Sequence, residues 1–391
     1  MSTGGRRPRA MRVLFVMWGW RTHLHPVAPL AWALRGAGHE VRVLGQPALG
    51  PAITELGLTA VAAGPDLDVL PEFRKFVLPA EARPAPEPPA DGVPRALKLF
   101  ARLAGEMAGD AVRFAQAWRP DLVVAEPTAF AGPLVAAALG IPSVRHLYGP
   151  DLVARAARFL PGLLEPIGGR LGVGPVDPLA GTTIDPTPSC LHAPGDLPRR
   201  LVRYLPCSGP ERAEVVLGPV ARPRVCVTWG HTMELLGPQY FLAGETARAV
   251  AELDVNVVLA VSARQRALLG DLPPTVSVFV DPPLDRLLAH CDVLVSQGGA
   301  GSVLTGLAAG LPQVAVGQLP DHLAIARRLE AAGAGRALAA AEFSAATVAG
   351  AVFDVLQRSG FAAAARRARL ENEDRPAPAE LVAELRSLAG R

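Results

Sequence analysis

A run of small residues between two apolar segments has the composition of an anion-binding turn. Gly298, Gly299 and Gly301 lie in the string SQGGAGS, between a short apolar run and the start of an expected helix. The backbone N–H groups of such a turn converge on one point, and the dipole of the following helix adds positive potential there. Small side chains let a phosphate or diphosphate approach closely, and Ser302 offers a hydroxyl that we expect to cap the helix. The alternative is that the glycines only permit a tight left-handed turn.

Two histidines and one glutamate lie where parallel strands are expected to end. His23 and His25 stand in the string GWRTHLHP after an apolar run, and Glu126 comes directly after the expected strand Leu122–Ala125. A histidine at a strand end can titrate near neutral pH and accept a proton from a hydroxyl group. These residues therefore suggest general base catalysis. The alternatives are that the histidines cap a helix or stay solvated, and that Glu126 only complements a helix dipole.

The elements around the histidines predict a parallel sheet. The apolar run Arg12–Met17 reads as a strand, Val27–Ala37 as a helix that ends at Gly38, and His39–Gly45 as the next strand. This order is one βαβ unit with a right-handed crossover. Ligands of such sheets bind at the carboxyl ends of the strands, so the loop 19–26 is expected to line a cleft.

The rest of the first half alternates between loops and strongly periodic segments. Residues 64–95 are rich in proline and acid, so they are expected to form a mobile loop without a regular element. Asp66 and Asp68 make a DxD pair, but no strand follows them, so a metal site there is not expected. Apolar residues at helical spacing predict a core helix over Arg95–Trp118. The segment Asp151–Gly195 predicts irregular helices and turns.

The second half repeats the alternation of buried strands and helices. A glycine-containing loop with His231 and Thr232 follows its first expected strand, so this loop is also placed at a sheet edge. The expected strands of this half are Arg224–Thr228, Asn256–Ser262, Val276–Val280, Val293–Ser296 and Gln313–Val316.

Composition limits the function classes. A chain of 391 residues suggests two domains, and its net charge of +3, without a basic stripe, gives no case for nucleic acid. No apolar run is long enough to span a membrane, and the first strand lacks the cleavage site of a signal peptide. The four cysteines have no CxxC spacing, which favours a reduced, cytoplasmic protein. The glycine turn matches neither GxGxxG nor the P-loop, so an oxidoreductase or a P-loop nucleotidase is not favoured.

The longer string that contains the glycine turn is more specific than its glycines. SQGGAGSVLTGLAAGLPQVAV, followed by PDHLAIARRLEAAGAG, resembles the donor-nucleotide segment of GT-B glycosyltransferases of family 1, in the bacterial branch that decorates antibiotics and other natural products. The resemblance implies an α/β fold of two Rossmann-like, doubly wound parallel-sheet domains that face an interdomain cleft. The expected parts are an acceptor-binding domain over 1–208, a linker over 209–223, a nucleotide-sugar-binding domain over 224–375, and a helix over 376–391 that packs back on the first domain.

The same resemblance assigns roles to residues. THLHPVAPLAWAL resembles the family string GHxxPxxPLAxAL, which implies that His23 is the catalytic base and places His25 at a variable position. Glu126 matches an acidic residue that orients the base. The family motifs imply donor binding by Gly230, His231, Thr232, Pro282, Gln297, Gly298, Gly299, Ala300, Gly301, Ser302, Asp321 and His322.

Four positions depart from the family pattern, among them His231, which is unusual in its loop. Gln297 replaces a histidine that donates to the diphosphate, and His322 replaces a glutamine that grips the sugar. Asp281 stands where an aromatic residue often stacks on the nucleotide base, so the base is left open. The departures at Gln297 and His322 suit an unusual deoxysugar or aminosugar, or else a protein that has lost catalysis.

The resemblance implies an inverting, metal-independent glycosyltransferase of the hexosyltransferase class. It would move a deoxysugar from a nucleoside diphosphate, with thymidine diphosphate expected, to a hydroxyl of a hydrophobic natural-product aglycone in antibiotic biosynthesis. No cofactor, nucleic acid or membrane partner is expected, and a homodimer is left open. The alternatives are an inactive GT-B helper of a partner glycosyltransferase and a GT-B sugar-nucleotide epimerase.

Overall fold

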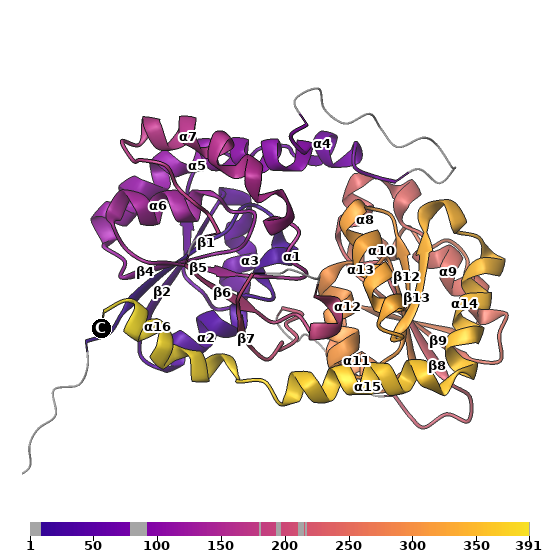
Figure 1. Ribbon diagram of the computed structural model, residues 1–391. Helices are drawn as coiled ribbons and strands as arrows, with labels where there is room; N and C mark the ends of the chain where they lie inside the picture. The colour runs from indigo at the N-terminus through magenta and orange to yellow at the C-terminus, as the bar shows by residue number, and fades with distance from the viewer. Residues whose placement is uncertain are drawn as a thin grey trace, which may run out of the picture.

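Two parallel sheets form the centres of two lobes that lie side by side (Figure 1). A computed structural model describes residues 9–78, 92–179, 181–192, 197–209, 215 and 217–390. Most of the expected polar leader, the stretch 79–91 of the expected loop, and residues 210–214 and 216 of the expected linker lie outside these ranges. The predicted fold class, two doubly wound α/β domains, is confirmed.

The first sheet has seven strands, and every neighbouring pair is parallel. Their continuous apolar runs suit a sheet that is covered on both faces. In spatial order the strands are β3 (Ala60–Ala62), β2 (Glu40–Gly45), β1 (Arg12–Val16), β4 (Leu122–Ala125), β5 (Ser143–His146), β6 (Thr182–Asp185) and β7 (Arg200–Leu201).

The second sheet has six parallel strands in an equivalent order. They are β10 (Val276–Val280), β9 (Asn256–Val261), β8 (Arg224–Thr228), β11 (Val293–Ser296), β12 (Gln313–Gly317) and β13 (Gly335–Ala339).

Each sheet reverses its strand order at one point, and these points position the site. In the first sheet the reversal lies between β1 and β4, whose last residues Val16 and Ala125 are register partners. In the second it lies between β8 and β11. Open α/β sheets bind ligands at the carboxyl ends of the strands beside such a reversal. His23 and Glu126 follow the first pair of strands, and the loops at Gly230 and Gly299 follow the second.

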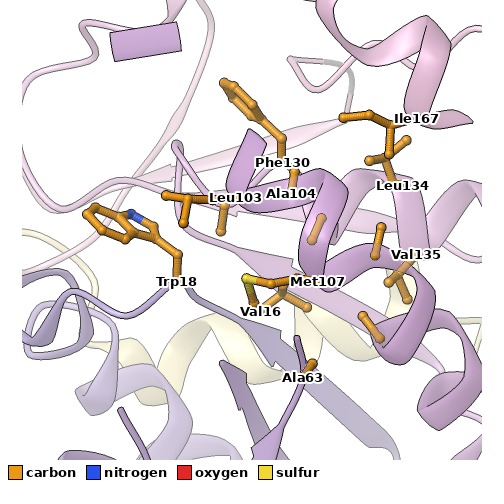
Figure 2. Packing of buried hydrophobic residues seen from close by; sticks show 14 of the residues in the cluster. Val16, Trp18, Ala63, Leu103, Ala104, Met107, Phe130, Leu134, Val135 and Ile167 are labelled. Atoms are coloured by element: carbon orange, nitrogen blue, oxygen red, sulfur yellow. The ribbon is translucent and has the colours of Figure 1, made fainter. Parts of the chain in front are cut away.

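Helices cover both faces of the first sheet. α5 (Arg95–Trp118), α6 (Ala131–Leu139) and α7 (Leu160–Arg170) cover one face, and Figure 2 shows their side chains meeting those of β1 in one buried layer. Met107 of α5 contributes to this layer beside Val16 and is fully buried, as the helical spacing predicted. Burying a side chain of this size stabilises the fold by about 1.5–3 kcal/mol.

The chain crosses back from the second lobe to the first at its end. α15 (Ser359–Glu373) lies along the second lobe, and α16 (Val382–Leu388) reaches the first, as the yellow ribbon in Figure 1 shows. Leu385 of α16 is buried in the core beside α2 (Ala28–Gly36), on the face of the first sheet opposite α5. The Asn372 side chain exchanges two hydrogen bonds, of 2.7 and 3.0 Å, with the backbone of Tyr204, which fastens the crossover where the first lobe ends.

Three expectations about secondary structure are wrong. The loop 19–26 contains a short helix, α1 (Arg21–Leu24), which carries His23. The segment Asp151–Gly195 contains the strand β6, which the sequence did not signal because its residues, TTID, do not form a continuous apolar run. The stretch 64–95 contains the helix α4 (Leu70–Arg74), whose order comes from contacts with the other lobe.

α4 is a strap between the lobes. Its Arg74 donates a hydrogen bond of 2.8 Å to the carbonyl of Leu236 in α8 (Thr232–Leu236), and the amide of Leu78 donates one of 2.8 Å to the carbonyl of Gln318. Phe73 and Phe76 pack against the cores of both lobes. The strap therefore lies within the part of the sequence that forms the first lobe, but its side chains contact both lobes.

No helix in the described ranges combines the length and the apolar character that a membrane crossing requires.

Candidate active site

A cavity of about 700 Å³ lies between the lobes, and both lobes line it. Its size is that of a pocket for a drug-sized ligand. The first lobe contributes an aromatic wall with Trp20, Phe73, Phe76, Phe100 and Tyr148. Of the residues that the sequence suggested, the cavity is lined by His23, Gly230, His231, Thr232, Pro282, Gln297, Gly299, Ala300, Gly301, Ser302, Asp321 and His322.

Glu126 lies behind His23, buried below the cavity surface. Nδ1 of His23 is 3.4 Å from Oε2 of Glu126, and the carboxylate side chain is fully buried while the imidazole keeps 13% of its surface exposed. The structure thus brings together the two residues that the sequence placed at one sheet edge. Since Nδ1 faces the carboxylate, Nε2 is the nitrogen left for a substrate.

Thr128 holds the carboxylate of Glu126 in place. Its amide donates to Oε2 at 2.9 Å, and its hydroxyl lies 2.7 Å from Oε1 and 2.8 Å from Oε2. The same hydroxyl accepts a hydrogen bond of 2.8 Å from the indole of Trp18. The carboxylate is therefore fixed by hydrogen bonds, which lets it be buried without leaving its oxygens unpaired.

Tyr148 is a site residue that the sequence reading missed. Its ring stacks on the imidazole of His23, with centroids 3.6 Å apart and planes 17° apart. Tyr148 follows β5, which pairs with β4, so it reaches the same edge of the sheet as Glu126. An aromatic residue two positions after the end of β5 was the available signal.

The glycine turn forms a cradle at the start of α12 (Ala300–Ala308). Gly298 has a φ of +80°, and Gly299 is the residue before the helix, so the first amides of α12 have no partner within the helix. The side chain of Ser302 does not cap the helix, contrary to expectation, because α12 begins two residues earlier and its cap position is Gly299. Ser302 still lines the cavity.

Gln297 and His322 converge on this cradle. A Cβ on Gly299 would lie 2.7 Å from Nε2 of Gln297 and 3.6 Å from Nε2 of His322. Both side chains are buried, yet Oε1 of Gln297 and Nδ1 of His322 have no hydrogen-bond partner. Burial lowers the pKa of His322, and the nearby Asp321 carboxylate offsets this only in part. The cradle thus has polar side chains whose hydrogen bonds are unmade, as a site for a polar ligand requires.

The loop after β8 lies against the cradle. Gly230 has a φ of +58°, and its backbone is so close to Gln297 that a Cβ would lie 2.2 Å from Nε2 of that side chain. The pKa of His231 is lowered, first by its recessed position in the cleft and then by the positive charge of Arg21. Thr232 is buried at the start of α8.

His25 is not suited to be the base. It lines the cavity, but desolvation, Arg21 and His231 lower its pKa to about 4. It is therefore neutral at neutral pH and a weak base. Asp66 and Asp68 accept hydrogen bonds from the amides of Ala48 and Leu70, which gives the DxD pair a structural role.

Gly298 and Glu126 are the two suggested residues that do not line the cavity. Gly298 shapes the turn, since its Cβ position is 3.0 Å from the carbonyl oxygen of His322. Among the described side chains, no group of three or more histidine, cysteine, aspartate or glutamate residues is arranged to hold a metal ion.

Comparison with known proteins finds relatives over nearly the whole length of the chain. The family described as "Erythromycin biosynthesis protein CIII-like" matches with its N-terminal domain at residues 32–85 and 92–230 and with its C-terminal domain at residues 245–388. The chain is 36% identical to 10-deoxymethynolide desosaminyltransferase of Streptomyces venezuelae, over 97% of this chain and 98% of that one. It is also 36% identical to aklavinone 7-beta-L-rhodosaminyltransferase of Streptomyces galilaeus, over 97% and 96% of the two chains.

Solved structures of glycosyltransferases also superpose on this chain over nearly its whole length. The glycosyltransferase VinC in complex with dTDP superposes with a TM-score of 0.79 at 30% identity, covering 97% of this chain and all of that one. Spinosyn rhamnosyltransferase SpnG complexed with thymidine diphosphate superposes with a TM-score of 0.81 at 29% identity, over 96% of this chain and all of that one. SpnG has also been solved with the spinosyn aglycone, with the same TM-score and coverage.

Proposed function

The chain belongs to the EryCIII-like glycosyltransferase family, and on this premise we propose that it transfers a deoxysugar from thymidine diphosphate to a natural-product aglycone in antibiotic biosynthesis. The observation that carries the proposal is the cavity, where His23 and the glycine cradle line one space from opposite lobes. Relatives whose names specify desosaminyl and rhodosaminyl transfer support a deoxysugar donor, and relatives solved with thymidine diphosphate support the nucleotide.

In the proposed reaction Nε2 of His23 takes the proton from an acceptor hydroxyl. The hydroxyl oxygen attacks the anomeric carbon of the sugar from the face opposite the leaving group, so the new C–O bond forms with inversion. The bond to the diphosphate breaks at the same time, and its electrons leave with the diphosphate. The buried carboxylate of Glu126, 3.4 Å from the imidazole, stabilises the imidazolium that forms.

The donor side would stabilise the departing negative charge. The free amides at Ala300 and Gly301 and the dipole of α12 favour an anion at the cradle. Gln297 and His322 can each donate a further hydrogen bond. Since these donors are already directed at one point, we propose that the reaction proceeds without a metal. Gly230, His231, Thr232, Pro282 and Asp321 are proposed as further donor contacts from their place on the cavity wall.

The acceptor would bind against the aromatic wall. Phe73, Phe76 and Phe100 line the cavity together with Trp20, and apolar rings of this kind bind hydrophobic ligands. We also propose a cytoplasmic location, because the free thiols of all four cysteines suit a reducing compartment. A homodimer is proposed as the oligomeric state.

The test is the variant His23→Ala, assayed with a thymidine diphosphate deoxysugar and an aglycone by mass spectrometry. Loss of the base should reduce turnover roughly 10²–10⁴-fold. Binding of thymidine diphosphate, measured by calorimetry, should stay unchanged because the cradle lies in the other lobe. His290→Ala, at an exposed position outside the cavity, is the matched control.

The same experiment separates the rival functions. Unchanged turnover in His23→Ala would reject the assignment of the base. A wild-type protein that binds no thymidine diphosphate would favour the inactive helper. Conversion of the donor sugar without any acceptor would favour the epimerase.

A further inference from the structure

Tyr148 is in contact with the proposed base and has no role in the reaction as described so far. We propose that Tyr148 is a positioning residue, whose ring holds the imidazole of His23 in the orientation that deprotonates the acceptor. The proposal rests on the proposed function, since it concerns the geometry of that base. The face of the Tyr148 ring holds the imidazole, and the hydroxyl group takes no part in the proton transfer.

The carboxylate alone does not fix the orientation of the imidazole. Although Nδ1 of His23 is 3.4 Å from Oε2 of Glu126, it makes no hydrogen bond with suitable geometry in the structure. The imidazole is instead confined by two rings. Tyr148 covers one face at 3.6 Å, and the indole of Trp18 meets the ring at 85° with centroids 5.7 Å apart. The plane of the base is therefore set mainly by its aromatic neighbours.

The turn that carries Tyr148 is rigidly held. Arg145, at the end of β5, makes two parallel hydrogen bonds of 3.1 and 2.6 Å with the carboxylate of Asp151, and both side chains are buried. The same guanidinium lies 3.2 Å from the hydroxyl of Thr183. The amide of Leu147 donates to the carbonyl of Ile184 at 2.9 Å. A bidentate pair of this kind locks both position and direction, so Tyr148 has a fixed base on which to stack.

The hydroxyl of Tyr148 is unsuited to proton transfer. Burial raises the pKa of this phenol well above its ordinary value, and the carboxylates of Glu126, Asp321 and Asp151 raise it further. A hydrogen bond with Thr128 opposes this rise in part. The phenol thus stays neutral in any ordinary buffer, and what it offers to His23 is the electron-rich face of its ring.

A ring face of this kind favours the protonated base. When His23 takes the acceptor proton, the imidazolium lies against the negative face of the phenol ring, an arrangement that is attractive for a cation. Stacking also restricts rotation of the imidazole before the reaction, which keeps Nε2 directed at the cavity. Both effects act on the transition state more than on substrate binding.

The experiment compares Tyr148→Leu, which removes the ring, with Tyr148→Phe, which keeps it. Tyr148→Leu should lower kcat about three- to tenfold, the size expected for one aromatic pair. Its KM values and its affinity for thymidine diphosphate should change less than twofold, and Tyr148→Phe should restore the rate. Tyr240→Leu, which removes a half-buried tyrosine outside the cavity, is the control for loss of an aromatic side chain.

A double-mutant cycle with His23→Ala tests whether Tyr148 changes the rate through His23. If Tyr148 acts through the base, Tyr148→Leu should not change the residual rate of the His23→Ala protein. The proposal is overturned if Tyr148→Leu keeps the wild-type kcat, if Tyr148→Phe is as slow as Tyr148→Leu, or if Tyr148→Leu slows the His23→Ala protein further. A fully active His23→Ala protein would reject the proposed function as well. If His23→Ala is inactive and the Tyr148→Leu variant is fully active, only the inference about Tyr148 is rejected.

Discussion

Replacing Glu126 by glutamine would remove one negative charge from the site while keeping the size of the side chain. An amide oxygen in the place of Oε2 could still accept hydrogen bonds from the amide and the hydroxyl of Thr128, so the turn after β4 should keep its shape. The NH2 group would then take the place of Oε1, and a neutral oxygen would face Nδ1 of His23. The variant therefore removes the charge that stabilises the imidazolium and leaves the local hydrogen bonds in place.

The distance between the two residues sets the magnitude. For unit charges 3.4 Å apart, an effective dielectric constant of about 20 gives an interaction of roughly 5 kcal/mol. If the imidazole carries the full charge in the transition state, this corresponds to a loss of roughly 4 × 10³-fold in kcat, and if it carries half of that charge, to about 60-fold. The full burial of the carboxylate means that solvent screening reduces these values little.

The assay is the initial rate of glycoside formation for Glu126→Gln, with a saturating donor. The expected result is a kcat that falls within that range, while thymidine diphosphate binds with unchanged affinity. Glu245→Gln, at an exposed position in α9 (Ala243–Ala251), removes a carboxylate far from the cavity and should retain full activity. A kcat within threefold of wild type would refute the electrostatic role of Glu126, and an equal loss of nucleotide binding would show that its role is structural.

Two further predictions concern the donor side. Gly298→Ala should lower the free energy of unfolding by about 1–2 kcal/mol in urea denaturation, because a side chain is disfavoured at a φ of +80°. Gly301→Ala should leave the free energy of unfolding unchanged or raise it, since its Cβ would meet no atom within 4 Å. The same variant should weaken thymidine diphosphate binding if the anion approaches this backbone closely. Equal effects of the two variants on both unfolding and binding would contradict this prediction. Affinity for the donor should rise as the pH falls from 8 to 6, because an anion raises the lowered pKa values of His231 and His322, so that binding takes up protons. In calorimetry His322→Gln should show a smaller rise than wild type, and an identical pH profile would exclude His322 from the diphosphate site.

The sequence predicted the central strands of both sheets, and it placed His23 and Glu126 at one sheet edge, because both inferences depend on local patterns. Apolar runs such as Leu122–Ala125 and Val293–Ser296 coincide with β4 and β11, since a strand buried on both faces needs a continuous apolar run. Residues that follow such strands gather at one sheet edge whatever the details of packing. This is why His23 and Glu126 could be paired from sequence alone.

The features that were missed depend on contacts between distant segments. α4 is a single turn with little helical preference of its own, and it is held by the carbonyl of Leu236, which lies in the other lobe. The importance of Tyr148 requires knowing that β5 lies beside β4. The helix start at Ala300 rather than near Ser302 is set by the glycine turn, whose geometry the sequence does not specify.

The strap α4 bears on attempts to build chimeras from related transferases. Phe73 and Phe76 form part of the aromatic wall of the cavity, yet the segment that carries them is tied to the carbonyls of Leu236 and Gln318 in the other lobe. An exchange of whole lobes would therefore separate the strap from the surface of the other lobe against which it packs. We expect the aglycone preference of the donor protein to be transferred only in part by such an exchange. Grafts should move α4 together with α8 and the segment at Gln318, so that the aromatic wall arrives with the surface on which it folds.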